Sequence, residues 1–489
     1  MEEFLSNDKA VTKKKIGRTE AFMMKYGIYI SLVTFLALYF MPTGMDPIAQ
    51  TSLAIFVTAL VMWVTKPIPI FITSIFVILA LPLLGAVDDA KDAFGTLGYE
   101  VIWLMVAAFV LTSAMNHTNL GKRFALNMVT RFGKTPKRMM AVLIFVNFAL
   151  AFFVPSTTAR ASLLVPIVLI LLEIYKAIPG ESKFGKLVML QGIQNNHFAT
   201  SMIMTATSGQ VIAIGFINEM TGANIGYMDW LLGSMPQAIL TAVIMFFVGI
   251  AIFKPENIKA DLSAINKAMK EELHKLGKMS ILEKKAAFYF GLTLFLWATG
   301  DYHEAVLGFE LETAQVAVLS MALILTPRIG VITWKQANIK WDLMIFSAGA
   351  YAAGKALNNS GGASWIISKL VDGLGLDSMS HSSVAVILIA ISVFSHIIFT
   401  SKTVRTTILI PAVIPLAYSL GMDPVRVALA VAFGIAYTTT LPPHSKVNTL
   451  YFSSGFFSVL EQLFYGLLAC TVGTIMISIV YFVWLPVIL

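Results

Sequence analysis

The segment FTSKTVRTTILIP, residues 399–411, places two cations inside a long apolar stretch. The preceding residues read SVAVILIAISVFSHIIF, and the following ones read ILIPAVIPLAYSLG. A Lys or Arg at the centre of a membrane helix costs roughly 2.5–3.5 kcal/mol on insertion scales. The charges of Lys402 and Arg405 must therefore be offset by another group, which an unbroken membrane helix does not supply.

The composition is that of a polytopic membrane protein. The 489 residues are 57% hydrophobic and 13% charged, and the mean hydropathy is +0.79. Soluble proteins are about half apolar and about a quarter charged. The single cysteine, Cys470, excludes a disulfide within the chain. The net charge of +8 lies mostly in short loops, where it orients the chain, so it does not indicate a nucleic-acid partner.

Apolar segments of about 20 residues predict membrane spans. Two stretches, 139–176 and 383–420, are nearly twice that length, and a Ser/Thr cluster divides each of them. Each is predicted to be a re-entrant hairpin, because irregular backbone inside a membrane requires surrounding protein or an aqueous cavity. The predicted fold is all-α, with two opposed hairpins and eleven spans near 23–42, 48–65, 70–87, 100–118, 189–219, 229–253, 285–299, 311–326, 341–358, 424–457 and 462–487.

The basic residues of the loops predict the orientation of these spans through the positive-inside rule. Lys13, Lys14, Lys15 and Arg18 precede the first span, and six basic residues lie between 121 and 138. The charged linker 254–284, which reads as an amphipathic surface helix, falls on the same side. The alternate loops are poor in Lys and Arg. We therefore predict that the N-terminus is cytoplasmic and the C-terminus is outside.

The two hairpin clusters are copies of one another. STTARASLLVPI, from Ser156, and SKTVRTTILIPA, from Ser401, share Ser, Thr, Arg, Leu and Pro in register at an offset of 245 residues. A shorter match between SAMNHTNLG and KALNNSGGA has an offset of 242 residues. Five predicted crossings separate the hairpins, and an odd number inverts the second copy. Inverted repeats with broken helices are typical of secondary transporters.

This duplication divides the chain into four predicted parts. They are an N-terminal segment with the first span (1–47), repeat 1 (48–253), the cytoplasmic linker (254–284) and repeat 2 (285–489). Each repeat is predicted to contain a broken helix after its hairpin, interrupted at TATSGQ (205–210) or at TTTLPPHSKVN (438–448). The prolines in the second interruption remove backbone donors, and helix N-termini at the hairpin turns offer N–H groups to an anion.

These features resemble the divalent anion/sodium symporter family, the INDY-like dicarboxylate and citrate carriers, over essentially the whole chain. Family members carry Ser-Asn-Thr at each hairpin tip, where it contacts a substrate carboxylate beside bound sodium, and a Pro-Pro-Asn element in the broken helices. The resemblance implies an elevator-type motion, a homodimer and a bacterial cytoplasmic membrane, with lipid around the protein. It implies a dicarboxylate site formed by Ser156, Thr157, Thr158, Ser401, Lys402, Thr403, Thr207, Ser208, Gly209, Pro442, Pro443 and His444.

The departures from the family motif predict that transport is not coupled to a bound cation. Thr157 and Lys402 replace the two asparagines that help to hold sodium in the family. A Lys ammonium has donors only and repels a cation. We therefore expect Lys402 to replace a coupling cation with a fixed charge. Arg160 and Arg405, two residues beyond each motif, either add to the charge of the site or brace the hairpins.

A fixed positive charge also predicts the mode of transport. An empty charged site resists crossing a low-dielectric barrier, whereas a site loaded with a dianion crosses more easily. The expected function is sodium-independent exchange of succinate, malate, fumarate or 2-oxoglutarate by alternating access. A sodium- or proton-coupled di- or tricarboxylate symporter is the alternative, and sulfate is a less favoured substrate.

Two other classes of protein fit the sequence less well. An intramembrane enzyme is disfavoured because the predicted spans contain almost no Asp or Glu, and the inverted repeats argue against a channel. The sequence contains no metal-ligand spacing, phosphate loop or nucleophile elbow, so no cofactor or metal is expected.

Overall fold

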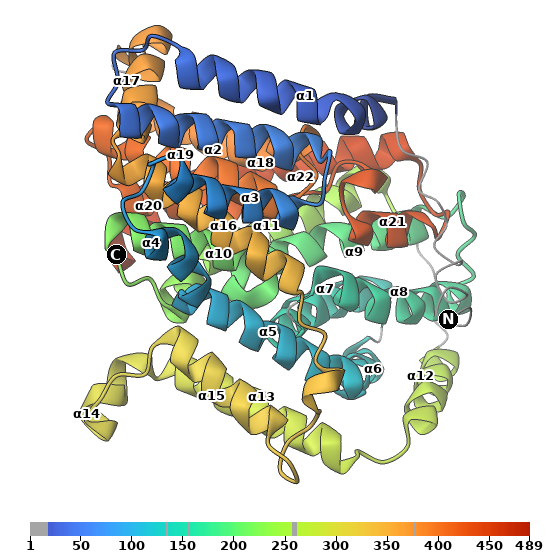
Figure 1. Ribbon diagram of the computed structural model, residues 1–489. Coiled ribbons are helices and arrows are strands. Elements are labelled where there is room, and N and C mark those ends of the chain that lie inside the picture. Colours follow the sequence, from blue (N-terminus) through green and yellow to red (C-terminus); the bar gives the residue numbers. More distant parts are fainter. Residues whose placement is uncertain (1–17, 134, 155, 257–261, 376–377) are drawn as a thin grey trace, which may run out of the picture.

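The computed structural model describes residues 18–133, 135–154, 156–256, 262–375 and 378–489, and this part of the chain is helical without strands (Figure 1). Seven described helices are long and apolar enough to cross a membrane, and four apolar helices are shorter. The seven are Phe22–Phe40, Pro47–Thr65, Ala90–His117, Pro136–Phe153, Thr157–Ile174, Tyr227–Phe253 and Val459–Ile488. An integral membrane protein is therefore supported, while the count of eleven spans stays a prediction.

The long helices form two groups, which we call the flanking group and the central group. The flanking group is α1 (Arg18–Phe40), α2 (Pro47–Thr65), α3 (Ile70–Leu83), α5 (Glu100–His117), α13 (Ile281–Ala298), α15 (Thr313–Leu325) and α16 (Trp341–Asn359). Figure 1 shows α1–α3 along one side and α13 and α15 along the opposite side, with the central group between them. Helices pack mainly within their own group, as α3 does on α16 and α5 does on α15.

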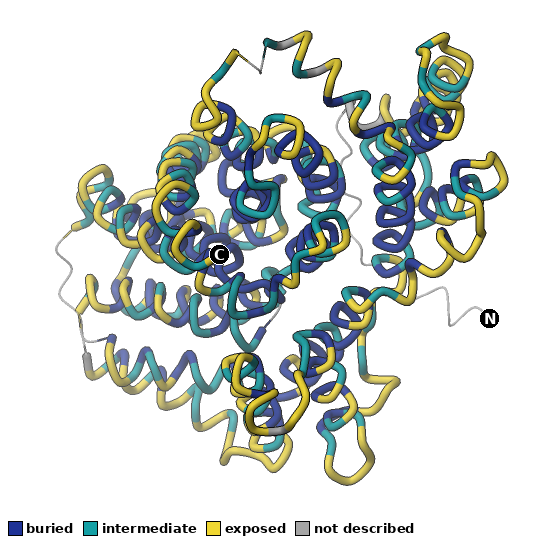
Figure 2. The backbone as a smooth tube through the Cα atoms, turned by 90° about the vertical axis from the view of Figure 1, so that its left-hand side faces the viewer, coloured by how far each residue is buried: buried dark blue, intermediate teal, exposed yellow. Residues whose placement is uncertain are grey.

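The central group contains both predicted hairpins and both predicted broken helices. Its members are α7 (Pro136–Phe153), α8 (Thr157–Ile174), α9 (Lys183–Met202), α10 (Ser208–Thr221), α11 (Tyr227–Phe253), α18 (His381–Phe394), α19 (Lys402–Ser419), α20 (Pro424–Ile435), α21 (Lys446–Phe452) and α22 (Val459–Ile479). Figure 2 shows buried residues mostly toward the interior of the molecule and exposed residues mostly along its outer edge. The exposed side chains of the central group include large hydrophobic ones, such as Phe145, Phe247 and Phe464.

The loops sort to the two ends of the molecule as the charge pattern predicts. In Figure 1, α1 begins at the end where α6 (Leu120–Phe132) and α12 (Leu262–Leu276) lie. The C-terminus lies at the other end, with α4 (Ala90–Phe94) and α14 (His303–Leu307). The basic loops therefore share one end. That this end faces the cytoplasm stays a prediction, and Lys13, Lys14 and Lys15 lie outside the described residues.

Several boundaries differ from the expected ones because polar residues start and stop the helices. Ser280 caps α13, so this helix begins at Ile281, inside the predicted linker. Ser182 caps α9, which begins at Lys183 rather than at 189. The second interruption begins at Ala436, and α21 ends at Phe452 rather than at 457. The charged loop near 131 contains α6, and α17 (Gly362–Leu374) follows α16.

Candidate functional site

Each hairpin turns at a serine that caps its second helix. α7 ends at Phe153 and α8 begins at Thr157, whereas α18 ends at Phe394 and α19 begins at Lys402 after a 3₁₀ turn. The Ser156 Oγ accepts a hydrogen bond of 3.3 Å from the Ala159 amide. The Ser401 Oγ accepts an equivalent bond of 3.3 Å from the Val404 amide. The two tips therefore share one local geometry, in which the N-terminus of the second helix lies at the turn.

The tip residues keep part of their surface open although their helices lie in the central group. All six motif residues are intermediate in exposure, and so are Thr207 and Ser208 in the first broken helix. The six are Ser156, Thr157, Thr158, Ser401, Lys402 and Thr403. Polar groups with this partial access are available to a ligand that enters the protein.

The second tip lies against the interruption of the first broken helix. α9 ends at Met202, a 3₁₀ turn spans Met204–Ala206, and α10 begins at Ser208. The Thr406 Oγ1 donates to the Gly209 carbonyl over 3.0 Å. A Cβ on the buried Gly209 would lie 3.2 Å from the Thr406 Oγ1 and 3.4 Å from the Lys402 Cβ, so a side chain here would press on α19. This contact brings two predicted site segments together.

Two adjacent residues of α9 connect the two tips. The Asn196 Nδ2 donates to the Thr157 carbonyl of the first tip over 3.2 Å. The Lys402 Nζ lies 3.3 Å from the Nδ1 atom of His197. Both α9 side chains are fully buried. Asn196 and His197 are therefore the meeting point of the two hairpins, although their polar run in an apolar helix is also typical of interhelical hydrogen bonds.

Arg160 braces the first hairpin from the interior. Its guanidinium is fully buried and donates to the Val154 carbonyl over 2.9 Å, at the end of α7. It also donates to the Asn196 carbonyl over 3.3 Å and to the Thr200 hydroxyl over 2.5 Å, both on α9. One side chain thus ties the hairpin turn to the first broken helix.

Arg405 does the same in the second hairpin. It is fully buried and donates to the Ser392 carbonyl over 3.4 Å and to the Ser395 hydroxyl over 3.2 Å, at the end of α18. It also donates to the Ile435 carbonyl, where α20 ends. Of the two roles that the sequence left open for the arginines, these contacts favour bracing.

The proline element lies beside the second tip without joining the Lys402 contacts. Pro442–His444 form one 3₁₀ turn in which Pro443 is exposed and His444 is buried. The His444 Nδ1 and the His396 Nε2 each lie 2.9 Å from the Thr440 hydroxyl. The two imidazoles pack edge to face at 5.4 Å between ring centres. These contacts hold His444 within the second interruption, on Thr440 and His396.

The described residues provide no acidic partner for the three cations of the site. Seven ion pairs are present in this part of the chain, and none includes Arg160, Lys402 or Arg405. Lys402 contacts a ring nitrogen of His197, whereas the arginines contact carbonyls and hydroxyls. A buried charge without a counter-ion is unfavourable, so the site is suited to an anion.

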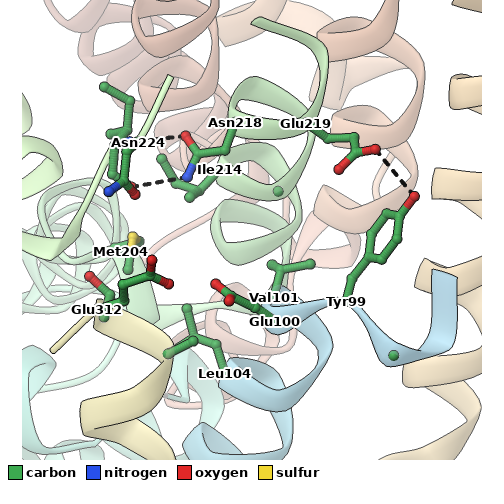
Figure 3. Close-up of a pocket in the computed structure, with 15 residues that line it drawn as sticks. Tyr99, Glu100, Val101, Leu104, Met204, Ile214, Asn218, Glu219, Asn224 and Glu312 are labelled. Atoms are coloured by element: carbon green, nitrogen blue, oxygen red, sulfur yellow. Dashed lines mark hydrogen bonds between the residues drawn. The ribbon is translucent and has the colours of Figure 1, made fainter. Parts of the chain in front are cut away.

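A separate cavity of 460 Å³ lies between the two helix groups (Figure 3). Residues of α5, α10 and α15 line it, and it reaches Met204 in the interruption of the first broken helix. The Glu219 carboxylate of α10 accepts from the Tyr99 hydroxyl over 3.2 Å and lies 3.2 Å from the Lys355 Nζ of α16. These contacts join the central group to the flanking group beside the cavity.

Comparison with known proteins places the chain among membrane transporters. The family described as "Sodium:sulfate symporter transmembrane region" matches residues 21–489. A chloroplastic dicarboxylate transporter 1 of Spinacia oleracea is 29% identical over 82% of this chain and 70% of its own length. An L-tartrate/succinate antiporter of Escherichia coli O6:K15:H31 is 26% identical over 95% of this chain and 98% of its own. The solved structure of MtrF of Neisseria gonorrhoeae is 13% identical with a TM-score of 0.58, covering 98% of this chain and 97% of that one, which supports the fold alone.

Proposed function

Since the chain belongs to the sodium:sulfate symporter family, the divalent anion/sodium symporters, we propose that it exchanges dicarboxylates across a membrane by alternating access. The proposed substrates are succinate, malate, fumarate and 2-oxoglutarate, and the exchange is independent of sodium. The members of this family are membrane transporters and not enzymes. The names of the spinach transporter and the E. coli antiporter support dicarboxylates as the substrate class.

The observation that carries this proposal is the group of three cations, Arg160, Lys402 and Arg405, for which the described residues supply no acidic partner. A dianion would neutralise two of these charges. One carboxylate is placed beside Lys402, where the hydroxyls of both tips and the N-terminus of α19 are accessible. Charge-assisted hydrogen bonds of this kind contribute about 1.5–3 kcal/mol each. The proposed site comprises the twelve residues named from the family motif, and Asn196 and His197 support it from α9.

The same charges account for obligatory exchange. In the proposed cycle, the central group moves as one body against the flanking group, an elevator-type motion. Lys402 cannot leave the site as a bound sodium ion can. An empty site therefore carries its charge into the low-dielectric barrier, and the return step requires a second dianion. The Glu219–Lys355 contact between the groups breaks during this motion.

A sodium- or proton-coupled di- or tricarboxylate symporter is the second candidate. Sodium takes oxygen ligands, and the broken helices of transporters coordinate it with freed carbonyls. Buried amide oxygens of α9 and α10 that have no hydrogen-bond partner among the described residues include Asn195 Oδ1, Asn196 Oδ1 and Gln210 Oε1. These oxygens are the specific observation in favour of this candidate.

The assembly and the location are part of the proposal. The two hairpins belong to inverted repeats, 48–253 and 285–489, joined by the linker 254–284. The protein is proposed to act as a homodimer in a bacterial cytoplasmic membrane. Cross-linking in native membranes tests the dimer, and accessibility of single cysteines in α6 and α14 to an impermeant reagent tests the orientation.

Reconstituted liposomes separate the two candidate functions. Uptake of labelled succinate is measured with or without internal succinate, and with sodium or choline outside. Uptake that requires internal dicarboxylate and is unchanged in choline supports the exchanger. Sodium-dependent uptake into empty vesicles contradicts it and supports the symporter. Protein-free vesicles control for leak.

A further inference from the structure

The contacts of Asn448 determine the orientation of its amide. The Asn448 Nδ2 donates to the Thr438 carbonyl over 2.7 Å and to the Leu441 carbonyl over 2.8 Å. Both carbonyls lie in the interruption between α20 and α21, and the Leu441 carbonyl also accepts from the His444 amide over 3.1 Å. Carbonyls only accept, so the nitrogen must face them and the Oδ1 atom must face His197. That oxygen lies 3.0 Å from the His197 Nε2.

This orientation fixes the tautomer of His197. An amide oxygen can only accept, so the Nε2 atom must carry the proton. In a neutral imidazole the Nδ1 atom then has a free electron pair. The Lys402 Nζ lies 3.3 Å from this atom, and the Thr438 hydroxyl lies 3.1 Å from it. An ammonium has only donors, whereas the Thr438 hydroxyl can donate or accept, so the proton-free Nδ1 is available to accept from Lys402.

We propose that His197 is a positioning residue, which, through its Nδ1 atom, holds the Lys402 ammonium toward one carboxylate of the substrate. This inference rests on the proposed function. A flexible lysine has about 2 kcal/mol of rotamer entropy, and a fixed acceptor restricts it before the substrate arrives. Asn448 in turn holds His197. This series of hydrogen bonds, from the Thr438 and Leu441 carbonyls through Asn448 and His197 to Lys402, links the second broken helix to the second hairpin through α9.

Two substitutions distinguish the roles of the two ring nitrogens of His197. His197→Asn retains an acceptor at the position of Nδ1 but has no group that reaches Asn448. His197→Gln retains a donor at the position of Nε2 but presents no acceptor to Lys402. We expect His197→Gln to raise the KM for succinate exchange about tenfold, with the maximal rate within about twofold of the wild-type rate, since about 1.4 kcal/mol is a factor of ten. His197→Asn is expected to raise the KM less than about threefold.

The outcomes separate this inference from the proposed function. If wild-type protein requires sodium and no internal dicarboxylate, the proposed function fails. If wild-type protein exchanges but both variants raise the KM equally, or lower only the maximal rate and the thermal stability, the positioning role is overturned. Should neither variant fold, ¹⁵N-histidine spectra of wild-type protein provide the test. A proton-free Nδ1 on the residue whose resonance shifts with succinate supports the role, and a protonated Nδ1 overturns it.

Discussion

The two hairpin tips have the same brace but differ in charge. Arg160 and Arg405 occupy equivalent positions, and each joins the end of the preceding helix to a broken helix. Ser156 and Ser401 cap the next helix with equal hydrogen-bond lengths. In the described part of the chain, Thr157 accepts a hydrogen bond from α9 through its backbone carbonyl, whereas the Lys402 ammonium contacts His197 on the same helix. The arginine and serine contacts that the two tips share stabilise the fold. The residue that differs between them, Thr157 or Lys402, can therefore determine which ligand the site binds.

The largest expected effect follows from removing either brace. Arg160→Leu and Arg405→Leu each leave buried carbonyls without donors, at about 1–3 kcal/mol for each group. We expect each variant to lose at least about 3 kcal/mol of folding free energy. Thermal unfolding in detergent measures the loss, and the exposed Arg138→Leu is the control. If one brace variant kept wild-type stability and lost only transport, that arginine would be a substrate ligand and the two tips would not be equivalent.

The next effect tests the difference in charge. Lys402→Asn restores the family residue and removes a charged donor worth about 1.5–3 kcal/mol. We expect exchange, measured as the maximal rate divided by KM, to fall about 10- to 100-fold. Thr157→Asn is the matched change in the first tip and is expected to have an effect below about threefold. Equal losses in the two variants would contradict the assignment of Lys402 as the charged member of the site.

The caps are expected to respond alike. Ser156→Ala and Ser401→Ala each remove an N-cap acceptor, which costs about 1 kcal/mol. Equal shifts in thermal unfolding would confirm that the two serines have the same structural role. The KM for succinate is measured in parallel, because a rise in only one variant would show that its hydroxyl also contacts the substrate.

The smallest effect concerns the surroundings of the hairpins. α12 packs on α6 and α8 beside the first hairpin, and the Lys122 Nζ lies 2.9 Å from the Glu272 carboxylate. Hydrogen bonds from Lys275 and Lys122 lower the pKa of Glu272. A lowered pKa in the folded protein means that this stabilisation is present above the unfolded value, about 4.3, and is lost as the pH falls through the folded value.

Hydrogen exchange across this pH range tests the ionic contact. We expect acidification to lower the free energy of local opening of α12, obtained from amide hydrogen exchange, by less than about 1 kcal/mol. α17, which packs on α19 beside the second hairpin, is expected to change less. Glu272→Gln should show this lower free energy already at pH 7, whereas the neighbouring Glu271→Gln should not. Equal acid sensitivity in α12 and α17 would contradict the difference between the two sides.

The sequence predicts the helical class and the places where the helices break. The Ser/Thr clusters at 156 and 401 are caps in the structure, since a serine followed by a helix-forming run satisfies free amides locally. The interruptions before Ser208 and after Ile435 also follow from short motifs. Such features depend on neighbours in the chain, and a pattern therefore reveals them.

Helix ends were less predictable. The apolar run near 189 gives no sign that Ser182 begins the helix, and the hydropathy near 285 hides the cap at Ser280. Hydropathy averages over many residues, whereas a cap depends on one side chain, so an apolar window misses the boundary by several positions.

The amino-acid sequence alone predicted a membrane protein with two related hairpins and an unusual lysine within an apolar stretch. Only the folded arrangement decided that Arg160 and Arg405 contact carbonyls and that Lys402 meets His197, a residue 205 positions away. Hydropathy and helix capping depend on residues that are close together in the sequence, so a short segment is enough to reveal them. The partner of a buried charge is set by which helices pack together, and no local pattern contains that information.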